Sequence, residues 1–334
     1  MDSQLHRAVL TDPLVPGDVG YVALTPPGWA PAERLPLIQV LHGADSSGEV
    51  LAFLRPVVDA LWADGSLPRA VLASASTPTV GGFYVDRAGA RWETLVAEAF
   101  PRLVAREYGT DPARVALLGS SMGGYGALKI AFADPARWRA VAAIAPALLP
   151  AATPADLRPR NTLGVLADLG REMAGDGTDA RRYAANRVVD RLRTNADAVR
   201  DSGLPIFLRC GDRDVFAMHD GAEQLHRALW EEDIGHEYHL VLGADHVGPE
   251  AVAAQRAALT FVGTALRGDA SGAADRELAA AWERWANGGR AGAPPEFDAT
   301  GSTAPLALRL MLAPALADRE HRDPTARRRY GRVD

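Results

Sequence analysis

Short apolar, β-branched runs alternate with helical patterns from about residue 19 to about residue 266. Several of the runs are apolar throughout, as expected for strands of a parallel sheet that helices cover on both faces. The predicted strands are residues 20–24, 37–42, 71–75, 115–119, 140–144, 206–210 and 238–242. The alternation therefore predicts an α/β protein with a mostly parallel central sheet.

Two of the intervening segments have a clear amphipathic face. In the first, apolar residues recur at three- and four-residue spacing, at Leu95, Val96, Ala99, Phe100, Leu103 and Val104. In the second, Asp220 and Glu223 have the spacing of a capping box at a helix start. Both segments are predicted to be helices that pack on the sheet.

Two segments depart from this alternation. Residues 147–203 are long for a connection and contain charge-rich helical stretches, which predicts a cap-like insertion in a catalytic domain of residues 1–266. Residues 267–334 form a C-terminal extension with one amphipathic stripe and a leucine-rich stretch at 306–316. We expect this extension to pack against the main domain or against a second subunit, with a disordered tail as the alternative.

The glycine-rich stretch GSSMGGYG at 119–126 raises the question of chemistry. A P-loop would require Lys and Ser or Thr after Gly124, where Tyr125 and Gly126 stand. A dinucleotide fingerprint would require a second glycine two positions after Gly119, where Ser121 stands. Neither phosphate-binding interpretation therefore fits.

The same stretch fits a nucleophile elbow. Residues 119–123 read G-x-S-x-G, between a predicted strand and a helix-like segment, which is the context that such an elbow requires. The central residue of this turn is strained and projects its side chain, while its neighbours two positions away must be small. Ser121 is therefore the candidate nucleophile, and Gly119 and Gly123 provide the clearance.

A serine nucleophile needs a base within hydrogen-bond reach and a carboxylate that orients the base. With an elbow, acid and base follow the serine in that order, after later strands. This order indicates Asp214 as the acid and His246 as the base, with Asp212 as a less favoured acid that serves its own turn and His219 as the competing base. Asp245, beside the base, is expected to be a solvated neighbour.

The developing oxyanion needs two donors, of which one is worth roughly 3–4 kcal/mol. The backbone N–H of Met122, directly after the nucleophile, is the first candidate. The loop after an early strand supplies the second candidate, the N–H of Ala44, with Gly43 allowing the backbone to turn inward. His42 ends that strand and is expected to shape this loop.

The composition limits the kinds of partner and cofactor that we expect for this chain. A net charge of -6 argues against general nucleic-acid binding, and no apolar run approaches the roughly 20 residues that span a bilayer. The N-terminus lacks a secretory pattern, which favours a cytoplasmic location. The single cysteine, Cys210, lies in an apolar run and is predicted to fill the core. The sequence has neither an HExxH motif nor paired cysteines, so no metal or organic cofactor is expected.

These features resemble the esterase family of α/β-hydrolases that includes esterase D, feruloyl esterases and mycolyltransferases. The resemblance covers roughly residues 20–266 and lies in the elbow at 119–128, the His42-Gly43 loop, and the segments FYVD at 83–86 and RWET at 91–94. It implies an α/β-hydrolase fold, with Ser121, Asp214 and His246 as triad and Ala44 and Met122 as oxyanion donors. It also implies that Tyr84 and Trp92 join His42 and Gly43 near the substrate.

The sequence thus predicts a serine carboxylic-ester hydrolase that acts on a small-molecule ester through an acyl-enzyme. Two alternatives stay open. An acyltransferase would use the same triad and give the acyl group to an alcohol or amine. A non-catalytic interaction protein would keep the fold but is expected to show a broken triad, whereas every triad position is filled here.

Overall fold

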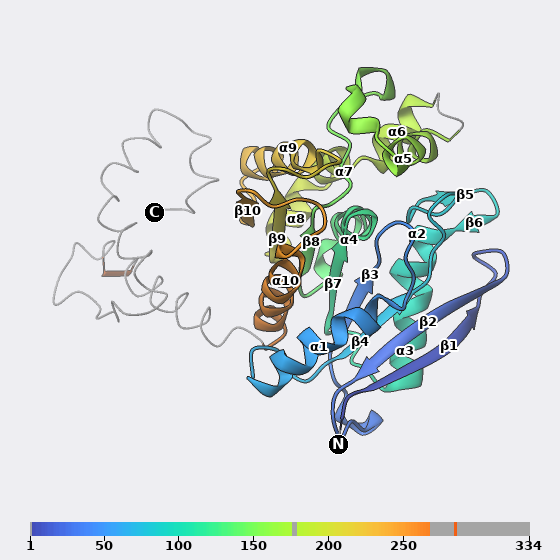
Figure 1. Cartoon of the computed structure of the whole chain (residues 1–334), viewed down its shortest axis with the longest axis vertical. Coiled ribbons are helices and arrows are strands. Elements are labelled where there is room, and N and C mark those ends of the chain that lie inside the picture. Colours follow the sequence, from blue (N-terminus) through green and yellow to red (C-terminus); the bar gives the residue numbers. More distant parts are fainter. Residues whose placement is uncertain (1, 176–178, 268–283, 286–334) are drawn as a thin grey trace. The chain divides into compact units, whose positions relative to one another are not determined.

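The structure is a computed structural model that describes residues 2–175, 179–267 and 284–285 (Figure 1). The chain divides into two compact units, Met1–Leu266 and Arg267–Asp334. The packing and oligomerisation roles predicted for residues 267–334 lie outside the described residues. The first unit contains the central sheet and the glycine-rich turn at 119–126.

An eight-stranded sheet forms the centre of this unit, in the order β1-β2-β4-β3-β7-β8-β9-β10 (Figure 1). The pairing is antiparallel between β1 and β2 and between β2 and β4. All other neighbours in this order pair parallel. The strands are β1 Gln4–Thr11, β2 Asp18–Thr25, β3 Leu37–Leu41, β4 Val71–Ala75, β7 Val115–Ser120, β8 Val141–Ile144, β9 Ile206–Gly211 and β10 Glu237–Val241, and a separate two-stranded hairpin joins β5 Asp86–Arg87 to β6 Ala90–Arg91.

Every predicted strand is present, with ends that differ by at most a few residues, but the sequence pattern missed β1. This strand lies at the edge of the sheet, and only Leu10 of its eight residues is buried. An exposed edge strand carries no continuous apolar run, so the pattern that identified the central strands is absent there.

Helices cover both faces of the sheet. Side chains alternate along a strand, so the neighbours Leu37 and Ile38 of β3 point into two different cores. The core that contains Ile38 is closed by α1 and α10, and the other core by the remaining helices. The helices are α1 Val50–Ala63, α2 Trp92–Thr94, α3 Phe100–Tyr108, α4 Met122–Ala133, α5 Val165–Met173, α6 Ala180–Asn186, α7 Val188–Thr194, α8 Ala196–Ser202, α9 Met218–Glu231 and α10 Glu250–Arg267, with a π-helical stretch Leu95–Ala99 between α2 and α3. None of the described helices is long and apolar enough to cross a membrane.

The predicted capping box of α9 is wrong. The helix begins earlier, at Met218, after Ala217 in the left-handed region, and the Met218 N–H donates to Asp214 Oδ1 at 3.4 Å. Asp220 lies inside the first turn, where its carboxylate accepts hydrogen bonds from Arg160 Nη2 at 2.7 Å and Asn161 Nδ2 at 2.8 Å. Asp220 therefore joins α9 to the 147–203 segment.

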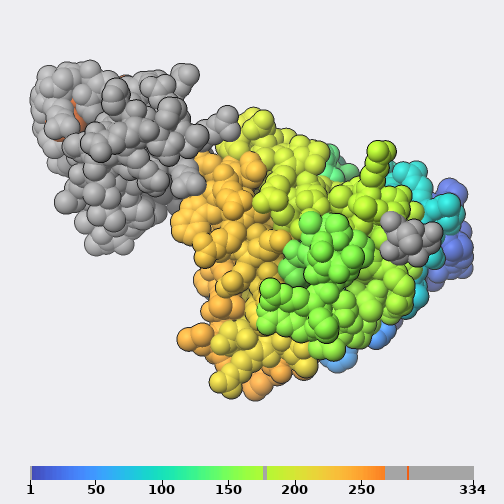
Figure 2. All heavy atoms as spheres, turned by 90° about the horizontal axis from the view of Figure 1, so that it is seen from above, coloured from blue at the N-terminus to red at the C-terminus, as the bar shows by residue number. Residues whose placement is uncertain are grey.

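Residues 147–203 contain α5 to α8, and Figure 2, where they are green to yellow-green, shows them over much of the surface seen from above. A buried charged cluster, which we call the Glu93 cluster, connects this segment to the helix after Ser121. Lys129 Nζ of α4 lies 3.1 Å from Glu93 Oε2 of α2 and 3.0 Å from Asn186 Oδ1 of α6. Arg191 of α7 donates to the other oxygen of Glu93.

Electrostatics in the Glu93 cluster favour the charged pair. Burial raises the pKa of Glu93, but the positive charges of Lys129 and Arg191 outweigh burial and leave the pKa below its usual value. Burial lowers the pKa of Lys129 to about 8, against the attraction of Glu93. The Lys129 side chain is fully buried, so its charge depends on these partners.

Candidate active site

The strands β3, β7, β9 and β10 run parallel, so their carboxyl ends lie on the same side of the sheet, at the ends of the strands. The loops that follow them carry Ala44, Ser121, Asp214 and His246, respectively. Parallel order thus brings together residues that are far apart in the sequence, at the edge where open α/β sheets place their ligands.

Ser121 occupies the turn between β7 and α4 with φ 55° and ψ -121°, a backbone conformation that non-glycine residues rarely adopt. The turn is crowded on both sides. A Cβ at Gly119 would lie 2.1 Å from Gly123 O, and one at Gly123 would lie 1.9 Å from Leu41 O. Both glycines therefore provide the space that the turn needs, as the elbow pattern predicts.

Gly123→Ala is expected to lower the free energy of unfolding by about 1–3 kcal/mol or more, because the added methyl overlaps the backbone of β3. Gly235→Ala is the matched control, since a Cβ there would meet no described atom within 4 Å. Urea denaturation followed by circular dichroism measures both. Equal midpoints for the two variants would contradict the tight packing of the turn.

The side chains of Ser121, His246 and Asp214 form a continuous chain of hydrogen bonds. His246 Nε2 lies 3.1 Å from Ser121 Oγ, and His246 Nδ1 lies 2.8 Å from Asp214 Oδ2. The Asp214 side chain is fully buried, and its other oxygen accepts the N–H of Phe216 at 2.9 Å. An ionised carboxylate only accepts, so Nδ1 carries the proton and Nε2 is open to accept one from Ser121.

The alternative acid and base lie elsewhere. Asp212 accepts the backbone N–H of Gly243 at 2.6 Å. It therefore stabilises a turn, but the turn is the one after β10 and not its own. His219 lies on α9 with Nε2 3.8 Å from Asp220 Oδ1. Asp245 is exposed as expected, but it is also hydrogen-bonded to the backbone of two residues, which the sequence did not indicate.

The loop after β3 passes directly beside Ser121. A Cβ at Gly43 would lie 3.7 Å from Ser121 Cβ, and Ala44, the predicted second donor, is the next residue of this loop. Neither the Ala44 N–H nor the Met122 N–H donates to another described residue. Both N–H groups are therefore without an acceptor among the described residues.

His42 and Tyr84 support this loop from below. The Thr77 N–H donates to His42 Nε2 at 2.9 Å, so Nδ1 carries the proton and donates to Gly43 O at 2.8 Å. Burial lowers the pKa of His42, which favours this neutral form. The Tyr84 hydroxyl donates to the carbonyl of His42 at 3.0 Å.

Among the residues expected to be near the substrate, only Gly43 is partly exposed beside Ser121. The side chains of His42 and Tyr84 are 1% and 0% exposed, and Trp92 is 6% exposed within the core of α2 to α9. The structure thus buries His42, Tyr84 and Trp92 and exposes none of them beside Ser121.

The sequence did not indicate Phe216 as a site residue. Its ring lies 4.9 Å from the His246 imidazole, nearly perpendicular at 81°. The position two residues after the acid is the signal that could have identified it. This edge-to-face arrangement is a favourable geometry for aromatic rings.

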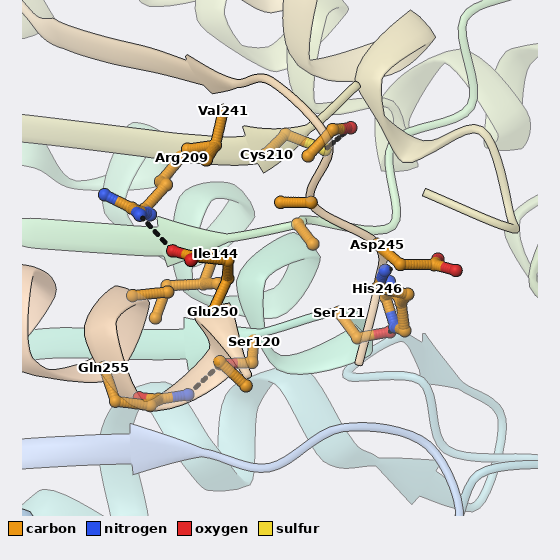
Figure 3. Close-up of a pocket in the computed structure, with 15 residues that line it drawn as sticks. Ser120, Ser121, Ile144, Arg209, Cys210, Val241, Asp245, His246, Glu250 and Gln255 are labelled. Carbon is orange, nitrogen blue, oxygen red and sulfur yellow. Dashed lines mark hydrogen bonds and ion pairs between the residues drawn. The ribbon is translucent and has the colours of Figure 1, made fainter. Parts of the chain in front are cut away.

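A cavity of about 80 Å³ adjoins Ser121 and His246 on the side of α10 (Figure 3). In Figure 3 the side chains of Ser121 and His246 lie next to each other, while Arg209 and Glu250 form an ion pair of 3.6 Å at the far end of the cavity. Gln255 Nε2 donates to Ser120 Oγ at 2.9 Å. Ser120 is therefore held by α10, whereas Ser121 is held by the imidazole.

Comparison with known proteins gives one family match and several partial relatives. The family described as "Putative esterase" matches residues 16–249. S-formylglutathione hydrolase of Rattus norvegicus is 37% identical over 82 residues, which are 23% of this chain and 29% of that protein. The matches to the curated relatives thus span less than a third of their length.

Solved structures match over most of the chain. A ferulic acid esterase has a TM-score of 0.65 at 19% identity, covering 79% of this chain and 99% of its own. An S-formylglutathione hydrolase from Agrobacterium tumefaciens has a TM-score of 0.63 at 18% identity, covering 79% and 96%. At these identities the likeness shows the fold, and it confirms the predicted α/β-hydrolase fold.

Proposed function

The chain belongs to this esterase family, and on that premise we propose that it is a serine hydrolase that cleaves esters through an acyl-enzyme on Ser121. The observation that carries the proposal is the unbroken hydrogen-bond chain from Ser121 Oγ through His246 to Asp214. The positive φ at Ser121 supports it, because backbone strain of this kind is typical of a functional position.

In the acylation step, Ser121 Oγ attacks the carbonyl carbon of the ester while His246 Nε2 takes the hydroxyl proton. The Asp214 carboxylate stabilises the imidazolium that forms. The N–H groups of Ala44 and Met122 donate to the oxyanion of the tetrahedral intermediate. When the intermediate collapses, the bond to the leaving group breaks and His246 returns the proton to the departing oxygen or sulfur.

Deacylation repeats these steps with water. His246 Nε2 takes a proton from a water molecule whose oxygen attacks the acyl carbon, and the same two N–H groups stabilise the second oxyanion. Collapse breaks the bond to Ser121 Oγ, which recovers its proton from His246. The products are a carboxylic acid and an alcohol or thiol.

The substrate class that we propose is a small-molecule ester or thioester. The name S-formylglutathione hydrolase contains a thioester substrate, and the name ferulic acid esterase contains an aromatic acid. Each of these compounds has an acyl carbonyl. The triad geometry suits either leaving group, since His246 protonates oxygen and sulfur alike.

Covalent labelling tests the nucleophile. A fluorophosphonate probe is expected to add one equivalent to the folded protein, at Ser121, as read by intact-mass and peptide mass spectrometry. Ser120→Ala is the matched control and should label like the wild type, because its hydroxyl is held by Gln255. Absence of label on Ser121, or label on Ser120, contradicts the proposal.

A further inference from the structure

The loop that carries the acid and the loop that carries the base are joined by two aspartates that point in opposite directions. Asp212, in the acid loop, accepts the N–H of Gly243 in the base loop at 2.6 Å. Asp245, in the base loop, accepts the N–H of Val215 in the acid loop at 2.8 Å. Each loop thus holds the backbone of the other.

The position of Asp245 relates it directly to the triad. It immediately precedes His246, whose N–H it also accepts, with the same oxygen, at 2.6 Å. Val215, its partner across the gap, immediately follows Asp214. A single carboxylate oxygen therefore bridges the backbone of the residue after the acid and the backbone of the base itself.

The two loops approach very closely at this point. A Cβ at Gly211 would lie 2.1 Å from the carbonyl oxygen of Ala244, and the N–H of Arg213 donates to that same oxygen at 3.0 Å. The backbone bonds fix the loops where they begin. Beyond them, the side chain of Asp245 joins Val215, directly after Asp214, to His246.

We propose that Asp245 is a positioning residue that sets the distance between Asp214 and His246 by bridging Val215 and His246. This inference rests on the proposed function and adds a residue to it. Asp245 reaches neither Ser121 nor the reacting atoms, so it acts through the imidazole. Its two backbone donors lower its pKa, so the carboxylate is ionised at neutral pH and accepts both bonds.

Asp245→Ala is expected to lower kcat for p-nitrophenyl acetate by about tenfold with KM changed less than about twofold, because misalignment affects the proton transfer more than binding. Asp245→Asn keeps an acceptor oxygen at the same place and should retain most of the activity. Asp201→Ala, which removes an exposed aspartate of α8, is the matched control and should leave kcat unchanged.

A double-mutant cycle separates positioning from general support of the fold. In the Asp214→Ala background, Asp245→Ala should cause no further loss of kcat, because the bond that it positions is gone. An equal loss in both backgrounds, or full activity of Asp245→Ala, overturns the proposal. Urea midpoints are measured in parallel, and the cycle is read with variants that are folded at the assay temperature.

A spectroscopic measurement makes the test independent of turnover. The His246 Nδ1 proton in its bond to Asp214 should give a far-downfield proton resonance in the wild type and in Asp245→Asn. In Asp245→Ala it should broaden or disappear, and an unchanged resonance there overturns the positioning role. If Ser121→Ala turns over ester like the wild type, the proposed function itself fails, whereas the resonance still reports on Asp245.

Discussion

Ser121→Ala is expected to lower kcat for p-nitrophenyl acetate on the order of 10⁴- to 10⁶-fold, because the attacking oxygen is removed while the donors at Ala44 and Met122 stay. His246→Ala should cost a similar factor. The double variant should lose little more than either single one, since nucleophile and base act as one unit. Stopped assays with purified protein measure this range.

Two comparisons keep that result interpretable. Ser120→Ala should stay within about tenfold of the wild type, because Ser120 is bonded to Gln255 and not to the imidazole. Circular dichroism should show the same fold in each variant. Equal rates for wild type and Ser121→Ala would end the proposal of a serine hydrolase.

Glu93→Gln is expected to lower the free energy of unfolding by about 3–5 kcal/mol, the cost typical of leaving a buried charge without its partner. The variant leaves Lys129 fully buried and Arg191 mostly buried, with a neutral amide in place of the carboxylate. Urea denaturation at pH 7 measures the change. Because Glu93 raises the pKa of Lys129, its replacement lowers that pKa further and disfavours the charged form of the buried side chain.

Glu98→Gln provides the matched control on the neighbouring turn. Glu98 pairs with Arg102 one helical turn away, and both side chains are about half exposed or more. Such a pair contributes roughly 0.3–0.5 kcal/mol, so the control should be near wild type. If Glu93→Gln is no more destabilising than Glu98→Gln, the Glu93 cluster does not connect α4 to the 147–203 segment as the contacts indicate.

The sequence indicated that Ser121, Asp214 and His246 lie together, and the structure joins them by hydrogen bonds, because each follows a predicted strand of the parallel sheet. Once the strands are parallel, their carboxyl ends meet, so the positions of Ser121, Asp214 and His246 relative to the strands imply their proximity. The same reasoning fails for β1, in which only Leu10 is buried. It also fails for the start of α9, where Ala217 is in a left-handed conformation and Asp220 bonds to residues 59 and 60 positions away.

Interactions across long sequence distances account for the rest of what was missed. Asp245 looks like a solvated residue because its partner Val215 is 30 positions away, and the Glu93 cluster joins helices whose contact no local pattern reveals. His42 was expected to shape the Gly43–Ala44 loop, and its hydrogen bond to Gly43 O agrees with that expectation. Tyr84 was placed near the substrate by resemblance to a family, but it is buried and donates to the carbonyl of His42 at the start of this loop.

The bond between Ser121 and His246 spans 125 positions of the chain. Neither local helix formation nor any single hairpin can create it, because strands β8, β9 and β10 must all be added to the sheet first. During refolding, ester turnover should therefore return later than the helical signal in circular dichroism. The recovered rate would be proportional to the fraction of molecules in which the whole sheet has formed.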